Sequence, residues 1–295
     1  MLIRRLAVIG VGLIGGSLAR ALRAAGEVEE IIGCGRGREN LVRALQLGVV
    51  DHFTHDIGEA VSGADMIFLA VPLGAMESTF RAMRGHLAEG VVITDGGSAK
   101  ASVVEACRSG MGTLPARFVP GHPIAGTEKS GVEASIEELY VGRRVILTPT
   151  DQTAPDALER VTSMWRSCGA EVALMSISHH DEVLAATSHL PHMLAFGLVD
   201  TLARMEENDE IFRYAAGGFR DFTRIASSNP VMWRDICVAN SQALGKVMAR
   251  YSEEMRILAE TIRREDGDTL LEIFSRAKAA RDRYIDTLSG PDSSE

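Results

Sequence analysis

The sequence is poor in cysteine, in basic charge and in long apolar runs. Its 295 residues include four cysteines without a CxxC pair, at Cys34, Cys107, Cys168 and Cys237. Scattered thiols are typical of a reduced, cytoplasmic protein and not of a disulfide framework. The formal net charge of −9 argues against nucleic acid as a main partner, because phosphate contacts need a basic face. No run of about 18 apolar residues occurs, so no membrane-spanning helix is expected, and no secretory signal is evident at the N-terminus.

A length of 295 residues predicts one large or two medium domains, and a hydrophobic fraction of 46% is ample for their cores. In the first part, short apolar runs alternate with stretches of helical spacing. The run 66–71, ended by Pro72, is typical of a central parallel strand that is covered on both faces. Strands are expected at residues 6–9, 31–34, 66–71, 91–94, 118–119, 145–148 and 172–175. This alternation predicts a Rossmann-type α/β domain with a mostly parallel sheet.

After Ser176 the pattern changes to helices alone. Helical spacing covers residues 178–204, 208–228, 231–264 and 266–288, with breaks at Gly217-Gly218 and Asn229-Pro230. We therefore expect the α/β domain over residues 1–176 and an all-α domain over residues 177–288. Residues 289–295, rich in Gly, Pro and Ser, are expected to form a disordered tail.

A glycine-rich turn, Gly10-Val11-Gly12-Leu13-Ile14-Gly15, follows the first expected strand. In such a unit the first glycine permits the tight turn, the second lets a pyrophosphate approach, and the third lets helix and strand pack closely. The helix N-terminus then faces the phosphates. This context predicts a dinucleotide site rather than a turn without a ligand. The candidate cofactor-binding residues are Gly10, Gly12, Leu13, Ile14, Gly15, Arg36, Val71 and Pro72.

The end of the second expected strand bears on the choice of nucleotide. NAD sites usually have an Asp or Glu there, which binds the ribose 2′-hydroxyl. This chain instead has Gly33-Cys34-Gly35-Arg36-Gly37-Arg38. The planar guanidinium of Arg36 is suited to a 2′-phosphate, although a solvated basic loop is the alternative. We expect NADP or NAD as cofactor, with NADP slightly favoured.

The candidate catalytic residues follow two other strand ends. Ser98 comes after the expected strand 91–94, and His122 opens the polar loop His122-Pro123-Ile124-Ala125-Gly126-Thr127-Glu128-Lys129-Ser130-Gly131. Ligands bind at the carboxyl ends of strands in such sheets, and a histidine there can accept a proton near neutral pH. Ser98 either faces the substrate or caps the next helix.

Histidines also cluster in the helical part. His189 and His192 are three residues apart, so they share a face if the helix continues through Pro191. They can line a pocket, form hydrogen bonds at a domain interface or bind a metal. No third ligand is evident, since His179 and His180 can face solvent, and we expect no metal.

The segment 217–235 contributes two further candidates. Arg224 or Arg220 can bind a carboxylate through its guanidinium, or can instead pair with a neighbouring aspartate. A tryptophan such as Trp233 is in general more often a core residue than a ligand-binding one.

Taken together, these segments resemble the prephenate/arogenate (cyclohexadienyl) dehydrogenase family. The matching stretches occur in consistent order at residues 10–17, 65–72, 94–100, 122–131, 188–196, 218–226 and 232–236. The resemblance implies an NAD(P)-dependent oxidoreductase of tyrosine biosynthesis. Such an enzyme decarboxylates prephenate to 4-hydroxyphenylpyruvate, or arogenate to tyrosine. The resemblance also implies a homodimer built by the helical domain.

The same resemblance implies roles for the site residues. His122 would accept a hydrogen bond from the C4 hydroxyl of the substrate ring and assist its deprotonation, and Ser98 would orient both groups. Arg224 would bind a substrate carboxylate. The other candidate substrate-binding residues are His189, His192, Glu128 at the mouth of the pocket, and Trp233.

Two other functions compete with this interpretation. A β-hydroxyacid or 6-phosphogluconate type dehydrogenase has the same domain order but uses a lysine in its helical part, where this chain has only Lys246 and Lys278. A non-catalytic NADP sensor on the same fold is disfavoured by the joint presence of His122, Ser98 and Arg224. The sequence does not separate prephenate from arogenate. No chorismate mutase or ACT domain is expected, so any tyrosine feedback would act at the active site.

Overall fold

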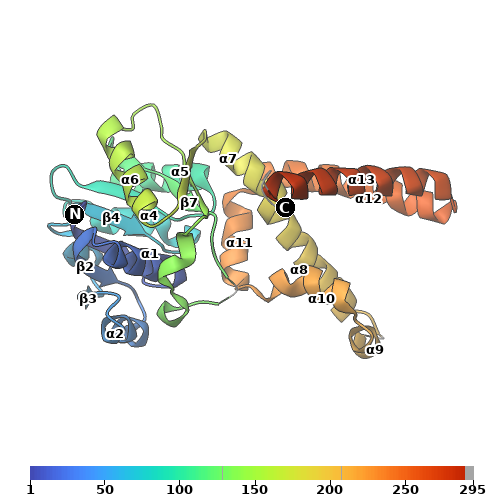
Figure 1. Cartoon of the computed structure of the whole chain (residues 1–295), viewed down its shortest axis with the longest axis horizontal. Helices are drawn as coiled ribbons and strands as arrows, with labels where there is room; N and C mark the ends of the chain where they lie inside the picture. The colour runs from blue at the N-terminus through green and yellow to red at the C-terminus, as the bar shows by residue number, and fades with distance from the viewer. Residues whose placement is uncertain (128, 207, 290–295) are drawn as a thin grey trace, which may run out of the picture. The chain divides into compact units, whose positions relative to one another are not determined.

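The computed structural model describes residues 1–127, 129–206 and 208–289, and the chain forms two compact units, Met1–Leu244 and Gly245–Glu295. A six-stranded sheet forms the centre of the first unit's N-terminal part (Figure 1). All of its strands are parallel, in the order β3-β2-β1-β4-β5-β6. The strands are β1 Ile3–Ile9, β2 Val28–Cys34, β3 His52–Thr54, β4 Met66–Leu69, β5 Val92–Asp95 and β6 Phe118–Val119. This is a Rossmann-type order, as predicted, and its ligand crevice lies where the order reverses between β1 and β4.

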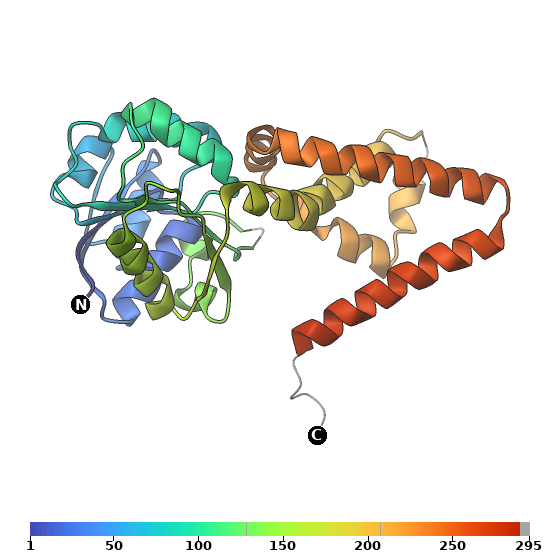
Figure 2. The same ribbon diagram turned by 90° about the horizontal axis from the view of Figure 1, so that it is seen from above.

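Both faces of this sheet are covered by helices, as the strand β1 illustrates. Leu6 and Val8 belong to one apolar core, and Ala7 and Ile9 belong to the other, because successive side chains of a strand point to opposite faces. Figure 2 shows helices above and below the strands. The first core is covered by α1 Leu13–Ala24, α2 Arg38–Gln46 and α6 Pro155–Ser167, and the second by α3 Ile57–Val61, α4 Met76–Met83 and α5 Lys100–Met111.

A second, three-stranded sheet has the order β7-β8-β9. Its strands are β7 Gly121–Pro123, β8 Arg144–Leu147 and β9 Glu171–Leu174. β7 is antiparallel to β8, with His122 opposite Ile146, and β8 is parallel to β9. The prediction that His122 opens a loop is therefore wrong, because backbone pairing with β8 makes this short Gly- and Pro-containing segment a strand.

The change from strands to helices occurs at Ser176, whereas the two compact units meet at residue 244. The Ser176 hydroxyl caps the first of these helices by accepting a hydrogen bond from the His179 amide. A π-helical turn, Ala185–His189, connects α7 directly to α8, so the helical path continues through Pro191 in the first turn of α8. The helices of this part are α7 Ile177–Leu184, α8 Leu190–Ala203, α9 Asn208–Arg213, α10 Gly217–Thr223 and α11 Pro230–Ala239.

The described part of the second unit consists of α13 Gly267–Ser289 and of α12 Ser241–Arg263 from Gly245 onward, both helices being 23 residues long. The single helix expected over 231–264 is interrupted at Asn240, between α11 and α12. Large apolar side chains are exposed on both helices, at Met255, Ile257, Ile262, Leu271, Phe274 and Tyr284. Within the described residues, no helix is both long enough and apolar enough to cross a membrane. Of the tail expected to be disordered, residues 290–295 lie outside the described residues.

Candidate active site

A cavity of about 540 Å³ lies at the carboxyl ends of β1, β2 and β4, and Gly10, Gly12, Arg36, Val71 and Pro72 contribute to its lining. Gly10 has a φ of +100°, and a Cβ on it would lie 2.3 Å from the Ala70 carbonyl oxygen, so only glycine fits this turn. A Cβ on Gly15 would lie 2.1 Å from the Gly10 oxygen, so α1 packs directly against the turn. At Gly12 a Cβ would meet nothing within 4 Å. The open backbone there fits a pyrophosphate at the N-terminus of α1.

The described residues that line this cavity include no Asp or Glu. Arg36, just after β2, is the arginine in the lining. Arg36 itself is exposed. The neighbouring Asn40 holds two other loops in place. Its Nδ2 donates to the Val11 carbonyl at 2.7 Å, and its Oδ1 accepts from the Val132 amide at 2.9 Å. The sequence has no acidic residue at the end of β2, and the described residues that line this cavity include none either.

A second cavity, of about 340 Å³, adjoins the first, because both are lined by Gly12, Ala70 and Gly131. Among the predicted site residues, the second cavity brings together Ser98, His122, His189 and Trp233, and also Leu13 and Ile14 of the glycine-rich turn. His192 and Arg224 do not belong to its lining. Glu128, expected at the mouth of the pocket, lies outside the described residues.

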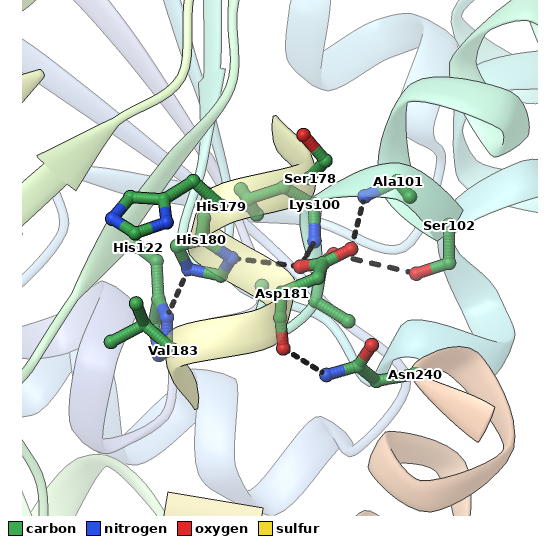
Figure 3. A network of polar contacts seen from close by, with 12 residues as sticks. Lys100, Ala101, Ser102, His122, Ser178, His179, His180, Asp181, Val183 and Asn240 are labelled. Atoms are coloured by element: carbon green, nitrogen blue, oxygen red, sulfur yellow. Dashed lines mark hydrogen bonds and ion pairs between the residues drawn. The ribbon is translucent and has the colours of Figure 1, made fainter. Parts of the chain in front are cut away.

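His122 is connected to two residues that the sequence analysis left without a role (Figure 3). It is 8% exposed, and its Nδ1 lies 2.9 Å from Nε2 of His180. Nδ1 of His180 lies 2.8 Å from Oδ1 of Asp181. The expectation that His180 faces solvent is wrong: its side chain is 0% exposed, because α7 packs against the N-terminal end of α5, and only His179 is exposed.

Asp181 also caps α5 across a long sequence separation. Its carboxylate accepts hydrogen bonds from the Lys100 amide at 2.8 Å and the Ala101 amide at 2.9 Å, which satisfies two free amides at the helix start. Burial raises the pKa of Asp181, but the hydrogen bonds from His180 and from these two amides outweigh it, so the pKa lies below its ordinary value. The N-cap residue is Ala99, with no side-chain cap. Ser98 therefore does not cap α5, and it belongs to the lining of the second cavity.

A buried ion pair lies directly behind these residues. Nζ of Lys100 is 2.5 Å from Oδ2 of Asp95 and donates to the Gly121 carbonyl at 2.6 Å. Oδ1 of Asp95 accepts from the Gly121 amide at 3.1 Å. Burial lowers the pKa of Lys100, although Asp95 opposes the shift. This pair joins β5 to β7 beside His122. The pair was not predicted, although an Asp and a Lys five residues apart after a strand are a signal for it.

His189 and Trp233 line the second cavity, and each has a buried ring nitrogen. Asn240 donates through Nδ2 to Nδ1 of His189 at 3.1 Å and to the Asp181 carbonyl at 2.8 Å. Nδ1 of His189 is therefore an acceptor, and the proton of the neutral ring is on Nε2. Burial lowers the pKa of His189 to about 4, so the ring is neutral at pH 7. Nε2 of His189 and Nε1 of Trp233 are both buried without a hydrogen-bond partner among the described residues.

His192 does not line the second cavity but packs against Trp233, which does. Its ring stacks on Trp233 with centroids 3.6 Å apart, and its Nδ1 donates to the Ser188 carbonyl at 2.8 Å. Burial lowers its pKa, and the nearby charge of Arg224 adds to the shift. Arg224 is exposed at the start of the 3-10 turn Arg224–Ser227. Among the described residues, no group of three His, Cys, Asp or Glu side chains is arranged to bind a metal ion.

The chain matches known proteins over almost its whole length. Residues 18–174 match the family model of the prephenate dehydrogenase nucleotide-binding domain, and residues 176–276 match that of the prephenate dehydrogenase dimerization domain. Cyclohexadienyl dehydrogenase of Zymomonas mobilis is 40% identical over 283 residues, covering 94% of this chain and 95% of that protein. Prephenate dehydrogenase of Bacillus subtilis is 38% identical, covering 92% and 74%.

Solved structures give the same result. The structure of prephenate dehydrogenase from Aquifex aeolicus in complex with hydroxyphenyl propionate and NAD+ has a TM-score of 0.88 at 38% identity, covering 95% of this chain and 98% of that one. Arogenate dehydrogenase of Synechocystis has a TM-score of 0.79 at 29% identity, covering 95% and 99%. Because both family models match in order and one relative is 40% identical over 95% of its length, the chain belongs to the prephenate dehydrogenase family.

Proposed function

We propose that this protein is an NAD(P)-dependent dehydrogenase that oxidatively decarboxylates prephenate, arogenate or both, in tyrosine biosynthesis. The observation that carries the proposal is the junction of the two cavities at Gly12, Ala70 and Gly131. A dinucleotide in the first cavity would bring its nicotinamide to the second cavity, where His122 and Ser98 lie. The names of relatives at 38% and 40% identity support this activity.

The residues of the first cavity fit the cofactor. Gly10 and Gly15 shape the turn, and the open backbone at Gly12 receives the pyrophosphate at the N-terminus of α1. Val71 and Pro72 line the same space, and Leu13 and Ile14 continue it into the second cavity. The bound nicotinamide supplies the acceptor for the hydride that leaves C4 of the substrate. We favour NADP over NAD, because Arg36 stands where NAD sites have an acid.

His122 is the proposed general base. Burial lowers its pKa well below 6.5, and electrostatic interaction with His180, Lys100 and His189 adds to the shift, so its ring is neutral at pH 7 and able to accept the C4 hydroxyl proton. As the O–H bond breaks and the hydride leaves C4, the O–H electrons form the C4 carbonyl. The electron pair left when the ring carboxylate departs as carbon dioxide then makes the ring aromatic and turns the carbonyl into a phenolate, to which His122 returns the proton. Ser98, in the same cavity, orients the hydroxyl.

The substrate's negative groups need hydrogen-bond donors in a protein of net charge −9. Nε2 of His189 and Nε1 of Trp233 are buried donors without a protein partner, and a bound carboxylate or carbonyl would satisfy them. Arg224 is the proposed cationic group for a carboxylate that extends beyond the cavity, and His192 supports the Trp233 ring from behind. Glu128 is proposed to lie at the mouth on sequence grounds alone.

The assembly and organisation of the chain belong to the same proposal. We propose a homodimer, supported by the match to a dimerization domain and by the exposed apolar side chains of α12 and α13. Measuring the mass in solution by light scattering tests this proposal.

We also propose a functional division at residue 176, where the two family models meet. Four free thiols support a cytoplasmic location.

Steady-state turnover tests the function. Prephenate and arogenate are each assayed with NAD and with NADP, and formation of the reduced nicotinamide is followed by absorbance. We expect turnover in at least one of the four combinations, and the highest kcat/KM assigns substrate and nucleotide together. If a folded protein that binds a dinucleotide turns over neither substrate, the proposal is wrong, and a hydroxyacid dehydrogenase or a nucleotide sensor takes its place.

A further inference from the structure

Three titratable side chains form a continuous hydrogen-bonded chain next to the second cavity (Figure 3). Asp181 and His180, neighbours on α7, contact each other at 2.8 Å, and His180 contacts His122 on β7 at 2.9 Å. His122 lines the cavity, whereas neither His180 nor Asp181 does. The chain therefore runs from a buried carboxylate to the proposed base.

An ionised carboxylate and a neutral His180 together fix the direction of each hydrogen bond in this series. An ionised Asp181 can only accept, so Nδ1 of His180 carries a proton and donates it. A neutral His180 then has a lone pair on Nε2, to which Nδ1 of His122 donates. A neutral His122 therefore has no proton on Nε2, its remaining polar atom.

We infer that Asp181 and His180 are positioning residues that hold His122 in the tautomer whose unprotonated Nε2 faces the substrate hydroxyl. This inference rests on the proposed function, in which His122 accepts that proton. Without the two residues, a neutral imidazole is free to place its proton on Nε2. In that tautomer His122 would be a donor toward the C4 hydroxyl and unable to act as a base.

Burial of His180 and further hydrogen bonds of Asp181 fix the two positioning residues in place. His180 is 0% exposed. The Asp181 carboxylate is bound by the Lys100 and Ala101 amides, and its backbone carbonyl accepts from Asn240 Nδ2 at 2.8 Å. Hydrogen bonds to the start of α5 and to the end of α11 thus prevent the carboxylate from turning away from His180, and orientation is maintained through the proton transfer.

The hydrogen bonds from Asp181 through His180 to His122 also stabilise His122 after the proton has moved. The substrate O–H bond breaks, and its proton forms a bond to Nε2 of His122. The resulting imidazolium still donates from Nδ1 to neutral His180, whose other nitrogen donates to the Asp181 carboxylate. This is the arrangement by which an aspartate orients a catalytic histidine in a Ser-His-Asp triad, extended here by one imidazole.

Variants at His180 test the inference. His180→Leu removes the acceptor for His122, and we expect kcat to fall about 10²-fold, at the lower end of the contribution of acid–base groups, while the KM for substrate and the Kd for nucleotide stay within about threefold. His180→Gln retains a neutral amide oxygen near the same position and should recover most of kcat. The matched control is His179→Leu, on the same helix but exposed, which should equal the wild type. Circular dichroism and nucleotide binding establish that each variant is folded.

A double-mutant cycle separates positioning from a merely structural role. If His180 acts only through His122, His180→Leu lowers kcat in the wild type but has no further effect in a His122→Asn background. Equal losses in both backgrounds, or an unchanged kcat in His180→Leu, overturn the inference and leave the proposed function intact. If His122→Asn itself keeps normal kcat, the failure lies with the proposed base.

Nitrogen-15 NMR of labelled histidine observes the tautomer directly. We expect the His122 resonances to show a protonated Nδ1 and an unprotonated Nε2 at neutral pH in the wild type, and a mixture of tautomers in His180→Leu. A wild-type His122 with its proton on Nε2 would overturn the inference.

Discussion

Lys100 and Asp95 form an ion pair that is fully removed from solvent, with 2.5 Å between Nζ and Oδ2 and both side chains 0% exposed. Both partners also bind the backbone of Gly121. We predict that Lys100→Met lowers the free energy of unfolding by about 3–5 kcal/mol, because it leaves the Asp95 carboxylate buried without its partner. Denaturant unfolding followed by circular dichroism measures the change.

An exposed pair is the control for this variant. Lys278 and Asp282 interact one turn apart on α13 with both side chains exposed, so Lys278→Met should change the free energy of unfolding by less than about 1 kcal/mol. A Lys100→Met variant as stable as Lys278→Met would show that the buried pair makes no net contribution.

His122→Asn should separate binding from chemistry. We expect kcat to fall about 10²–10⁴-fold, because the proton acceptor is lost, while substrate binding is retained. Single-turnover kinetics and the KM for substrate measure the two effects. A variant with near-normal kcat would remove His122 from the mechanism.

Arg36→Ala should change nucleotide preference. Losing a planar cation at the β2 rim is expected to raise the KM for NADP at least about tenfold and to leave the KM for NAD nearly unchanged, since only NADP has a 2′-phosphate. Arg38→Ala is the matched control, because Arg38 is exposed two residues away and outside the cavity lining. Equal effects of Arg36→Ala on both nucleotides would argue against a phosphate contact.

Arg224→Ala should raise the KM for substrate far more than it lowers kcat, because a carboxylate contact present in both ground and transition states contributes uniform binding. Arg220→Ala, in the same segment on α10, provides the comparison and should have little effect on KM. An unchanged KM in Arg224→Ala, or a larger effect in Arg220→Ala, would contradict the assignment of Arg224 as the carboxylate-binding residue.

The stability of the fold should depend on pH through its buried histidines. Burial lowers the pKa of His189 from 6.5 to about 4 and also lowers the pKa values of His122 and His192. Below pH 6.5 the unfolded chain binds protons that the folded chain does not. The free energy of unfolding should therefore decrease as the pH falls from 6.5 toward 4 and be level above 6.5.

For His189 alone, lowering the pKa from 6.5 to about 4 corresponds to a change in the free energy of unfolding on the order of 3 kcal/mol across this pH range. Chemical denaturation between pH 4.5 and about 8 measures the dependence. His189→Gln should make the curve less steep, because glutamine does not titrate, while His122 and His192 still contribute. Equal stability at both ends of the range would mean that these histidines bind protons as readily in the folded chain as in the unfolded one.

The parts of the site that were predictable from sequence depend on local chain geometry. The glycine-rich turn is read from the spacing of Gly10, Gly12 and Gly15, and each glycine has the steric environment that the motif requires. The parallel sheet followed from continuous apolar runs such as 66–71. Ser98 and His122 were expected at strand ends, and both line the second cavity.

The parts that were missed depend on contacts between distant segments. Nothing near Asp181 in the sequence indicates that its carboxylate caps α5, 80 residues earlier. The burial of His180 follows from the same packing, and a histidine beside another histidine at a helix start gives no local sign of it. β7 was missed because only its partner β8 makes it a strand. Arg224 stays a prediction, since it lies outside the cavity lining.

The π-helical turn Ala185–His189 makes the number of residues in this segment a determinant of the site. His180 and His189 are nine positions apart, and on an uninterrupted α-helix nine positions correspond to about two and a half turns, which would direct the two rings to opposite sides. The wider turn changes this register, so that His180 reaches His122 while His189 reaches Asn240. If the same residues formed an ordinary α-helix instead of the wider turn, α8 would rotate by about 100° relative to α7. Such a chain would keep every proposed catalytic side chain, but the rings of His180 and His189 would point to opposite sides of the helix.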